Sequence, residues 1–230
     1  MKIGIIAAMP EELVYLTQNL DKPQEVQVMG NTYYTGTVGN TEVVLVQSGI
    51  GKVMSAMSVA VLADHFQVEA IINTGSAGAL AEGIAVGDVV IADKLVYHDV
   101  DVTAFGYAYG QMAGQSLYFE SDKKFIARIQ ESLSQVEQTW HLGLIATGDS
   151  FIAGDDKIAS IKSHFPDVLA VEMEGAAIAQ AAQALDLPFL VIRAMSDNAN
   201  HEASISFDEF IIEAGRRSAQ VLLAFLKALN

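Results

Sequence analysis

Short and almost wholly apolar runs recur along this chain, and each is about as long as a β-strand. Runs of this length and composition suit strands that are buried on both faces, as in a sheet that helices cover on each side. The predicted strands are Lys2 to Ala8, Val43 to Gln47, Ala70 to Asn73, Val89 to Ala92, Leu142 to Ala146 and Phe189 to Ala194.

Helical patterns lie between these strands, which predicts an α/β domain with three layers, an αβα sandwich. The first pattern follows Pro10, which suits the first turn of a helix because its missing N–H group costs nothing there. The turn signal Gly39-Asn40 between Thr32 to Gly39 and Thr41 to Gln47 indicates a hairpin, so the central sheet is expected to be mixed. The predicted helices are Glu11 to Asn19, Lys52 to Phe66, Asp122 to Val136, Asp155 to His164, Glu174 to Leu185 and Phe207 to Leu229.

The composition favours a single domain over residues 1–230. At 51% apolar residues, the chain can form one continuous core. Its formal net charge of -15 disfavours nucleic acid and anionic membranes as partners, because both are bound largely through Lys and Arg. Cysteine is absent and the five histidines show no metal-ligand spacing, so no metal site is expected.

The N-terminal residues predict a cytoplasmic protein. Their apolar run reaches Pro10-Glu11-Glu12 too early for a signal peptide. No later run approaches the roughly 18 apolar residues of a membrane span. We therefore expect neither secretion nor membrane insertion.

Polar and glycine-rich segments follow the predicted strands. In an α/β sheet, ligands bind beyond the carboxyl ends of the strands, so these segments are expected to converge on one crevice. They are Met9-Pro10-Glu11-Glu12, Ser48-Gly49-Ile50-Gly51-Lys52, Thr74-Gly75-Ser76-Ala77-Gly78, Thr147-Gly148-Asp149-Ser150-Phe151-Ile152, Ala170-Val171-Glu172-Met173-Glu174-Gly175-Ala176-Ala177 and Met195-Ser196-Asp197-Asn198.

The glycine-rich segments also have structural interpretations. Gly49 and Gly51 resemble part of a dinucleotide-binding fingerprint, but Met54 stands where its third glycine should be. A turn that allows close packing is therefore the better interpretation, and a nicotinamide-dependent enzyme is disfavoured. The segment from Gly75 to Gly78 is either a tight turn or a ligand-facing loop.

The acidic residues leave similar alternatives. Glu12 could simply complement the positive end of a helix dipole, and Asp197 could be a helix N-cap. Glu172 and Glu174 share one face if their segment is extended, and a buried acid there needs a partner or a function. Arg193, inside an otherwise apolar strand, is expected to pair with one of these acids.

Taken in order, the segments resemble the bacterial 5′-methylthioadenosine/S-adenosylhomocysteine nucleosidases, and the resemblance covers nearly the whole chain. It implies a fold like that of the nucleoside phosphorylases and no cofactor. It also implies an enzyme that uses water to cut the N-glycosidic bond of 5′-methylthioadenosine and S-adenosylhomocysteine, with 5′-deoxyadenosine as a further substrate. The matching stretches are Gly4 to Glu12, Ser48 to Lys52, Asn73 to Gly78, Gly148 to Phe151, Val171 to Ala176 and Arg193 to Asp197.

By this resemblance, Glu12 would activate the attacking water, Asp197 would protonate the leaving purine at N7, and Glu174 would hold the ribose hydroxyls. A base beside the water and an acid at the leaving group suit cleavage through an oxocarbenium-like transition state. Asp197 must hold a proton near neutral pH, which requires burial or hydrogen bonding that raises its pKa.

The resemblance also implies the residues that bind substrate. Phe151 would stack on adenine, the Ile152 backbone would read the edge of the base, and Ser196 would support Asp197. The remaining expected residues are an apolar wall for the 5′-thio group, Met9, Ile50, Met173 and Phe207, together with Ser76, Ala77, Gly78 and Arg193.

Members of the resembling family are homodimers, so a second copy of the chain is an expected partner. The loop around Val102, Phe105 and Tyr107 would complete the site of the partner. This would give a role to Thr103 to Ser116, the longest stretch without a clear period, which is otherwise expected to be a loop.

Two other function classes stay open. A purine nucleoside phosphorylase would need converging cations or a free helix N-terminus to hold phosphate. The two acids of the first loop and the scarcity of arginine favour water instead. A non-catalytic nucleoside-binding protein would share the pocket but would not need both Glu12 and Asp197.

Overall fold

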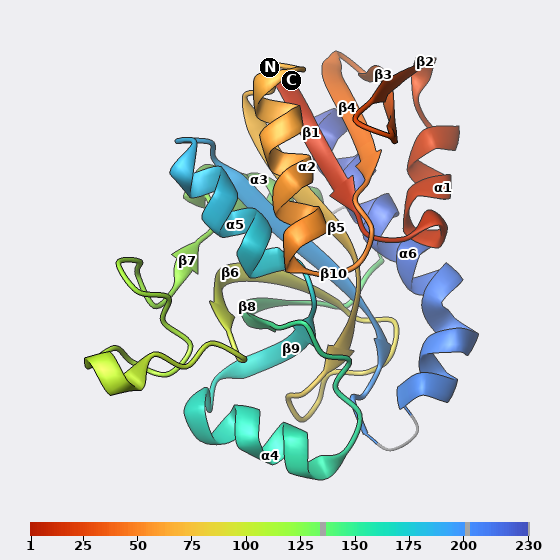
Figure 1. Ribbon diagram of the computed structural model, residues 1–230. Coiled ribbons are helices and arrows are strands. Elements are labelled where there is room, and N and C mark those ends of the chain that lie inside the picture. The colour runs from red at the N-terminus through yellow and green to blue at the C-terminus, as the bar shows by residue number, and fades with distance from the viewer. Residues whose placement is uncertain (134–136, 201–202, 230) are drawn as a thin grey trace.

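A ten-stranded mixed sheet runs through the computed structural model, which describes residues 1–133, 137–200 and 203–229 (Figure 1). The strands are β1 Lys2–Ala7, β2 Asp21–Val28, β3 Asn31–Val38, β4 Thr41–Gln47, β5 Ala70–Ala79, β6 Val89–Tyr97, β7 Phe119–Glu120, β8 Trp140–Thr147, β9 Val168–Glu172 and β10 Phe189–Asp197. Their order is β10-β6-β8-β9-β5-β1-β4-β3-β2, with β7 beside β6. Because β10 also pairs with β5, the strands β5, β10, β6, β8 and β9 form a closed ring.

Helices cover both faces of the sheet. The helices are α1 Pro10–Gln18, α2 Lys52–Asp64, α3 Lys123–Leu133, α4 Asp155–His164, α5 Gly175–Ala184 and α6 Ala203–Ala228. One hydrophobic cluster joins α1, α3 and α6 to Ile3 and Ile5 of β1, and a second joins α2 and α5 to Ile6. Alternate residues of a strand point to opposite faces, so the predicted three-layer α/β arrangement is confirmed (Figure 1).

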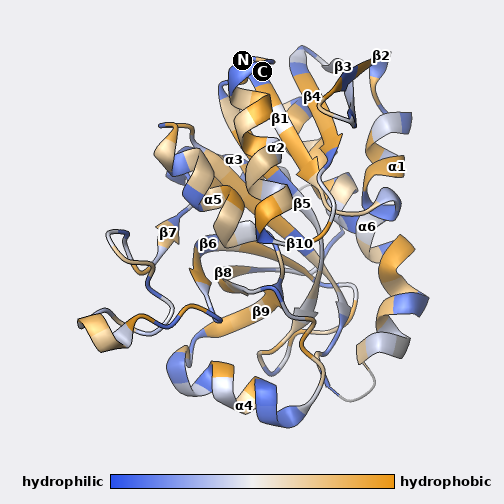
Figure 2. Ribbon diagram, viewed as in Figure 1, coloured by the Kyte–Doolittle hydropathy of each residue, from blue (hydrophilic) through white to orange (hydrophobic). Residues whose placement is uncertain are grey.

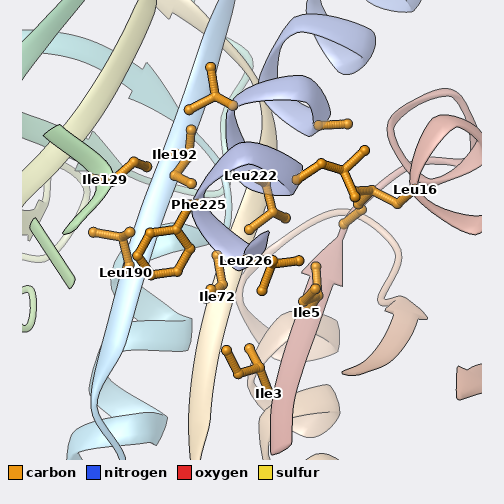
Figure 3. Packing of buried hydrophobic residues seen from close by; sticks show 14 of the residues in the cluster. Ile3, Ile5, Leu16, Ile72, Ile129, Leu190, Ile192, Leu222, Phe225 and Leu226 are labelled. Atoms are coloured by element: carbon orange, nitrogen blue, oxygen red, sulfur yellow. The ribbon is translucent and has the colours of Figure 1, made fainter. Parts of the chain in front are cut away.

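The long helix α6 packs one side against β1, β5 and β10 (Figure 3). Leu222, Phe225 and Leu226 recur at the three- and four-residue spacing of one helix face, and all three are fully buried. Phe225 also meets Phe125 of α3 edge to face, with 5.6 Å between the ring centroids. This packing anchors the C-terminal half of α6 to the middle of the sheet.

Hydropathy follows this layering. In Figure 2, apolar residues gather in central strands such as β1, whereas α4 carries mostly hydrophilic residues. Within α4, Ile161 is buried and Ile158 is partly buried, and both pack against the cluster that includes residues of β8 and β9. No helix in the described ranges is long and apolar enough to cross a membrane.

Each predicted strand is present, but several end later than predicted. β5 continues to Ala79 rather than Asn73, β6 to Tyr97 rather than Ala92, and β10 to Asp197 rather than Ala194. The small and polar residues that indicated turns are instead extended and paired. Within β5, Ser76 pairs with Ala194 and Gly78 with Asp197, so the predicted post-strand loops are the strand ends themselves.

The helix predictions differ from the structure mainly at the ends. α6 begins at Ala203 rather than Phe207, and α2 ends at Asp64 rather than Phe66. The predicted helix up to Val136 ends at Leu133 within the described residues, and Val136 lies outside them. The predicted hairpin is confirmed as the antiparallel pair β3 and β4.

Candidate active site

A cavity of about 440 Å³ opens where the ends of β1, β5, β9 and β10 meet the first turns of α6. It brings together residues from six well-separated parts of the sequence. Its lining residues are Ala8, Met9, Glu12, Ile50, Ser76, Ala77, Gly78, Phe151, Val171, Met173, Glu174, Arg193, Ser196, Asp197, Ser204, Phe207 and Asp208.

All predicted substrate and catalytic residues except Ile152 line this cavity. The Ile152 side chain is buried instead in the cluster that includes Leu80 and Ala199. Ser204 and Asp208 also line the cavity but were not predicted: Ser204 precedes the predicted helix start at Phe207, and Asp208 follows Phe207 in a helix where no pattern marks it as a site residue. In α6 these three residues lie three and four positions apart, so they share one helix face.

Glu12 is buried at the start of α1, where hydrogen-bond donors hold both of its carboxylate oxygens. Oε1 accepts hydrogen bonds from the backbone N–H and the hydroxyl of Ser76, both at 2.9 Å. Oε2 accepts from the backbone N–H groups of Ala8 and Met9 at 2.9 and 3.1 Å. Glu12 therefore joins the end of β1 to β5 and faces the cavity in a fixed orientation.

Arg193 is fully buried and pairs with two acids, as its place in an apolar strand predicts. Its Nη2 donates to Glu172 Oε2, to Asn73 Oδ1 at 2.5 Å and to Glu174 Oε2 at 3.3 Å. Its Nη1 donates to the backbone carbonyl of Ser76 at 3.2 Å. One guanidinium thus ties β10 to β5 and β9 beneath the cavity.

Glu172 holds the start of α5 in place. Its Oε2 accepts the backbone N–H groups of Glu174 and Gly175 at 2.9 and 2.7 Å. Its Oε1 accepts a hydrogen bond from the hydroxyl of Thr147. The sequence pattern indicated that Glu172 and Glu174 share one face, and both do contact Arg193.

Glu174 is the N-cap residue of α5 and lines the cavity. Its Oε1 accepts the backbone N–H of Gly51 at 3.0 Å. Burial raises the pKa of Glu174 to about 7, against the opposing attraction of Arg193. Both protonation states of Glu174 are therefore accessible at neutral pH.

Asp197 is the last residue of β10 and is buried. Its Oδ1 accepts the backbone N–H of Ala199 at 2.7 Å, and its Oδ2 accepts the hydroxyl of Ser196 at 2.9 Å. Burial raises the pKa of Asp197 above the usual range of an aspartate, although both hydrogen bonds lower it. The N-cap interpretation is wrong, because α6 begins only at Ala203.

Gly78 allows Asp197 to approach β5 closely. A Cβ atom at position 78 would lie 2.8 Å from Asp197 Oδ1. The glycine segment that could have been a simple turn therefore makes room for a carboxyl group that lines the cavity.

Aromatic and apolar side chains form the rest of the wall. Phe151 is 41% exposed and meets Phe207 edge to face, with 5.7 Å between the ring centroids. Met9, Ile50 and Met173 complete the apolar lining. The cavity thus offers a flat aromatic surface and an apolar wall beside its carboxyl groups.

The predicted partner loop lies outside the cavity of its own chain. Val102, Phe105 and Tyr107 are not among the lining residues, and Phe105 is 83% exposed in a short 3-10 turn, Thr103–Phe105. Among the described residues, no group of three or more His, Asp or Glu side chains could hold a metal ion.

The fold and the cavity together fall within a known class of proteins. Residues 2–227 match the phosphorylase superfamily, and the chain belongs to that superfamily. Within it, full-length relatives that are 49% and 83% identical to the chain are 5′-methylthioadenosine/S-adenosylhomocysteine nucleosidases, which confirms the family that the sequence motifs indicated.

These relatives match over their full length. The nucleosidase of Listeria monocytogenes is 49% identical over 233 residues, and the match covers all of both chains. A Streptococcus pneumoniae nucleosidase, solved with a transition-state inhibitor, is 83% identical, covers all of both chains and has a TM-score of 0.98. A Streptococcus pyogenes structure solved with 5-methylthiotubericidin is 64% identical, covers 100% of this chain and 98% of that one, and has a TM-score of 0.98.

Proposed function

We propose that this chain hydrolyses the N-glycosidic bond of 5′-methylthioadenosine and S-adenosylhomocysteine, releasing adenine and the 5′-substituted ribose, and that it also accepts 5′-deoxyadenosine. The observation that carries this proposal is that two buried carboxyl groups, those of Glu12 and Asp197, line one cavity but have different surroundings. The carboxylate of Glu12 accepts four hydrogen bonds, three from backbone N–H groups and one from a hydroxyl. Burial favours the protonated form of Asp197. Such a contrast is typical of a paired base and acid.

In this reaction, Asp197 donates its proton to N7 of the purine while the electrons of the glycosidic bond move into the leaving base. Water then attacks the anomeric carbon, and Glu12 accepts its proton. The Ser76 hydroxyl that donates to Glu12 Oε1 can rotate, so a water can donate to that oxygen in its place. Each acid–base step contributes on the order of 10²–10⁴ in rate.

The remaining residues that the resemblance implies bind the substrate, including Ile152 beside the pocket residue Phe151. Glu174 accepts hydrogen bonds from the ribose hydroxyls, Phe151 stacks on adenine, and the Ile152 backbone contacts the edge of the base. Ser196 orients Asp197 through its hydrogen bond. The apolar wall of Met9, Ile50, Met173 and Phe207 suits a 5′-thio substituent.

Water fits this cavity better than phosphate does. Among the described residues that line the cavity, Arg193 is the cation, and it forms ion pairs with Glu172 and Glu174. The lining also includes the carboxyl groups of Glu12, Asp197 and Asp208. A phosphate nucleophile would be repelled there, since phosphate sites need converging donors and positive charge.

We also propose that two copies of the chain associate through α2. Its exposed apolar residues Val53, Met54 and Met57 lie just beyond Ile50, which lines the cavity. An apolar row of this kind is typical of an interface. A partner on this face would bring its own Val102, Phe105 and Tyr107 to the cavity.

A cytoplasmic location stays a prediction from the sequence.

The proposed reaction is tested by following adenine release from 5′-methylthioadenosine. We expect hydrolysis without phosphate, and a loss of at least about a hundredfold in kcat/KM for Glu12→Gln and for Asp197→Asn in folded protein. Glu209→Gln, beside the cavity residue Asp208 but outside the lining, is the matched control. Ribose 1-phosphate as a product would show a phosphorylase, and an unchanged rate in either variant would remove the role of that residue.

A further inference from the structure

A charged cluster beside the cavity joins the first residue of α2 to the loops that follow β6 and β8. Lys52 Nζ lies 2.9 and 2.8 Å from Oδ1 and Oδ2 of Asp99, and 3.7 Å from Oδ2 of Asp149. Asp99 Oδ2 also accepts the backbone N–H of Asp149 at 2.9 Å. None of the three residues is among those that line the cavity. We call them the Lys52 cluster.

Asp149 caps a helix to which it does not belong. Its Oδ1 accepts the backbone N–H of Lys52, the first residue of α2, at 2.9 Å. The N-cap residue of α2 is Gly51, which has no side chain of its own to accept a hydrogen bond. Gly51 has a φ of +96°, and a Cβ atom there would lie 3.0 Å from Asp149 Oδ1. The glycine and the aspartate therefore fit each other across two loops.

Two parts of the cavity wall depend on this contact. The N–H of Gly51, next to the N–H that Asp149 holds, donates to Glu174 Oε1 at 3.0 Å. On the other side, Phe151 lies two residues after Asp149 and forms part of the cavity lining. Asp149 thus sits between an acid and an aromatic ring that face the cavity from different elements.

We propose that Asp149, held by Lys52 and Asp99, is a positioning residue that sets the places of Glu174 and Phe151. This inference rests on the proposed function, in which Glu174 binds ribose and Phe151 binds adenine. Asp149 affects Glu174 through the N-terminus of α2, and it affects Phe151 through the loop that contains both residues. It does not touch the substrate itself.

The cluster is suited to positioning more than to holding the fold together. The side chain of Asp149 is 50% exposed, and half-exposed ion pairs contribute little to global stability. Small displacements of binding groups, in contrast, strongly affect how a substrate is held. Removing Asp149 is therefore expected to change substrate binding without unfolding the chain.

The test compares Asp149→Ala with Asp149→Asn, Lys52→Met and the exposed control Asp156→Asn. We measure KM and kcat for 5′-methylthioadenosine, the Kd of adenine by calorimetry, and the melting temperature. Asp149→Ala should raise both KM and the adenine Kd at least about fivefold, whereas kcat should stay nearly unchanged. This pattern is expected when a variant binds the substrate and the transition state less tightly by the same amount. Asp149→Asn keeps an oxygen acceptor for the Lys52 N–H, so it should recover most of the loss.

Two results would overturn the inference. One is an unchanged KM and adenine Kd in Asp149→Ala. The other is a change that follows the melting temperature across all the variants, which would make the cluster purely structural. A wild-type protein that binds adenine but does not hydrolyse 5′-methylthioadenosine would overturn the proposed function instead, and the adenine Kd series would still decide the role of Asp149.

Discussion

The carboxyl group of Glu174 lies in a cavity that three other acidic residues also line, and Arg193, the cation that contacts it, is shared with Glu172. The guanidinium therefore compensates only part of the cost of burying the charged form. Burial raises the pKa of Glu174 from its usual 4.5 to about 7. A ligand that donates hydrogen bonds to this carboxyl group would lower the cost of ionising it.

This environment predicts a pH-dependent cost in stability. The folded state binds the Glu174 proton more tightly than the unfolded state does, so this contribution is complete below pH 4.5 and is lost as the pH rises through about 7. Glu174→Gln, which mimics the protonated form, should therefore unfold at a higher temperature than the wild type at pH 8. The gain is at most on the order of 3 kcal/mol.

The difference between the two proteins should shrink toward zero at pH 5. Thermal unfolding of both, followed by circular dichroism from pH 5 to pH 8, measures it. Equal melting temperatures at pH 8 would show that Arg193 compensates the charge fully. The same variant should bind 5′-methylthioadenosine less tightly, because an amide does not replace a carboxylate as an acceptor for two hydroxyls.

At the scale of elements, the sequence predicts the strands well where both faces are buried and poorly elsewhere. β1 and β10 carry continuous apolar runs because helices cover both sides of them. β2 was missed because it is an edge strand with mostly exposed residues, so no apolar pattern marks it. The ends of β5 and β10 were missed because glycine, serine and aspartate indicate turns locally, whereas pairing between the two strands keeps their ends extended.

The candidate site shows the same limit. Glu12, Glu174 and Asp197 stand out in the sequence as acids next to apolar strands, but the pattern alone left structural alternatives open, and their separate roles came from the resemblance to a family. The pairing of Arg193 with one of these acids was also expected, but the three other hydrogen bonds of Glu172 were not, since only the folded chain brings Glu172 to Thr147 and to the start of α5. Sequence patterns find candidate groups, but their partners depend on the register of the strands.

Gly75 of β5 lies next to two residues that line the cavity, Arg193 and Glu12. A Cβ atom there would lie 2.7 Å from both Arg193 Nη1 and Glu12 Oε1. Gly75→Ala should therefore displace both groups, lowering stability by roughly 1–3 kcal/mol and activity by at least about tenfold. Gly83→Ala is the matched control, because Gly83 also has a positive φ but no atom within 4 Å of the added carbon. Equal activities in the two variants would show that β5 has room at this position.

At the scale of the whole molecule, α2 lies at the surface of the chain, and Ile50, two residues before the helix begins, lines the cavity. Ser55, Ser58, Val59 and Leu62 of α2 are buried in this chain. Val53, Met54 and Met57 occupy its other side and are exposed. Burial of these residues against a second copy is the association proposed above, and it would remove their apolar surface from water.

Val53→Glu tests this association, because a charge placed in an apolar interface costs far more than one left in water. Ile212→Glu on α6 is the matched control, since Val53 and Ile212 are both 69% exposed. We expect sedimentation to show dimers for the wild type and Ile212→Glu, and monomers for Val53→Glu at the same concentration. If the partner loop completes the cavity, the monomeric variant should also lose most of its activity. A dimeric Val53→Glu protein would place any interface elsewhere, and a fully active monomer would show that one chain holds a complete site.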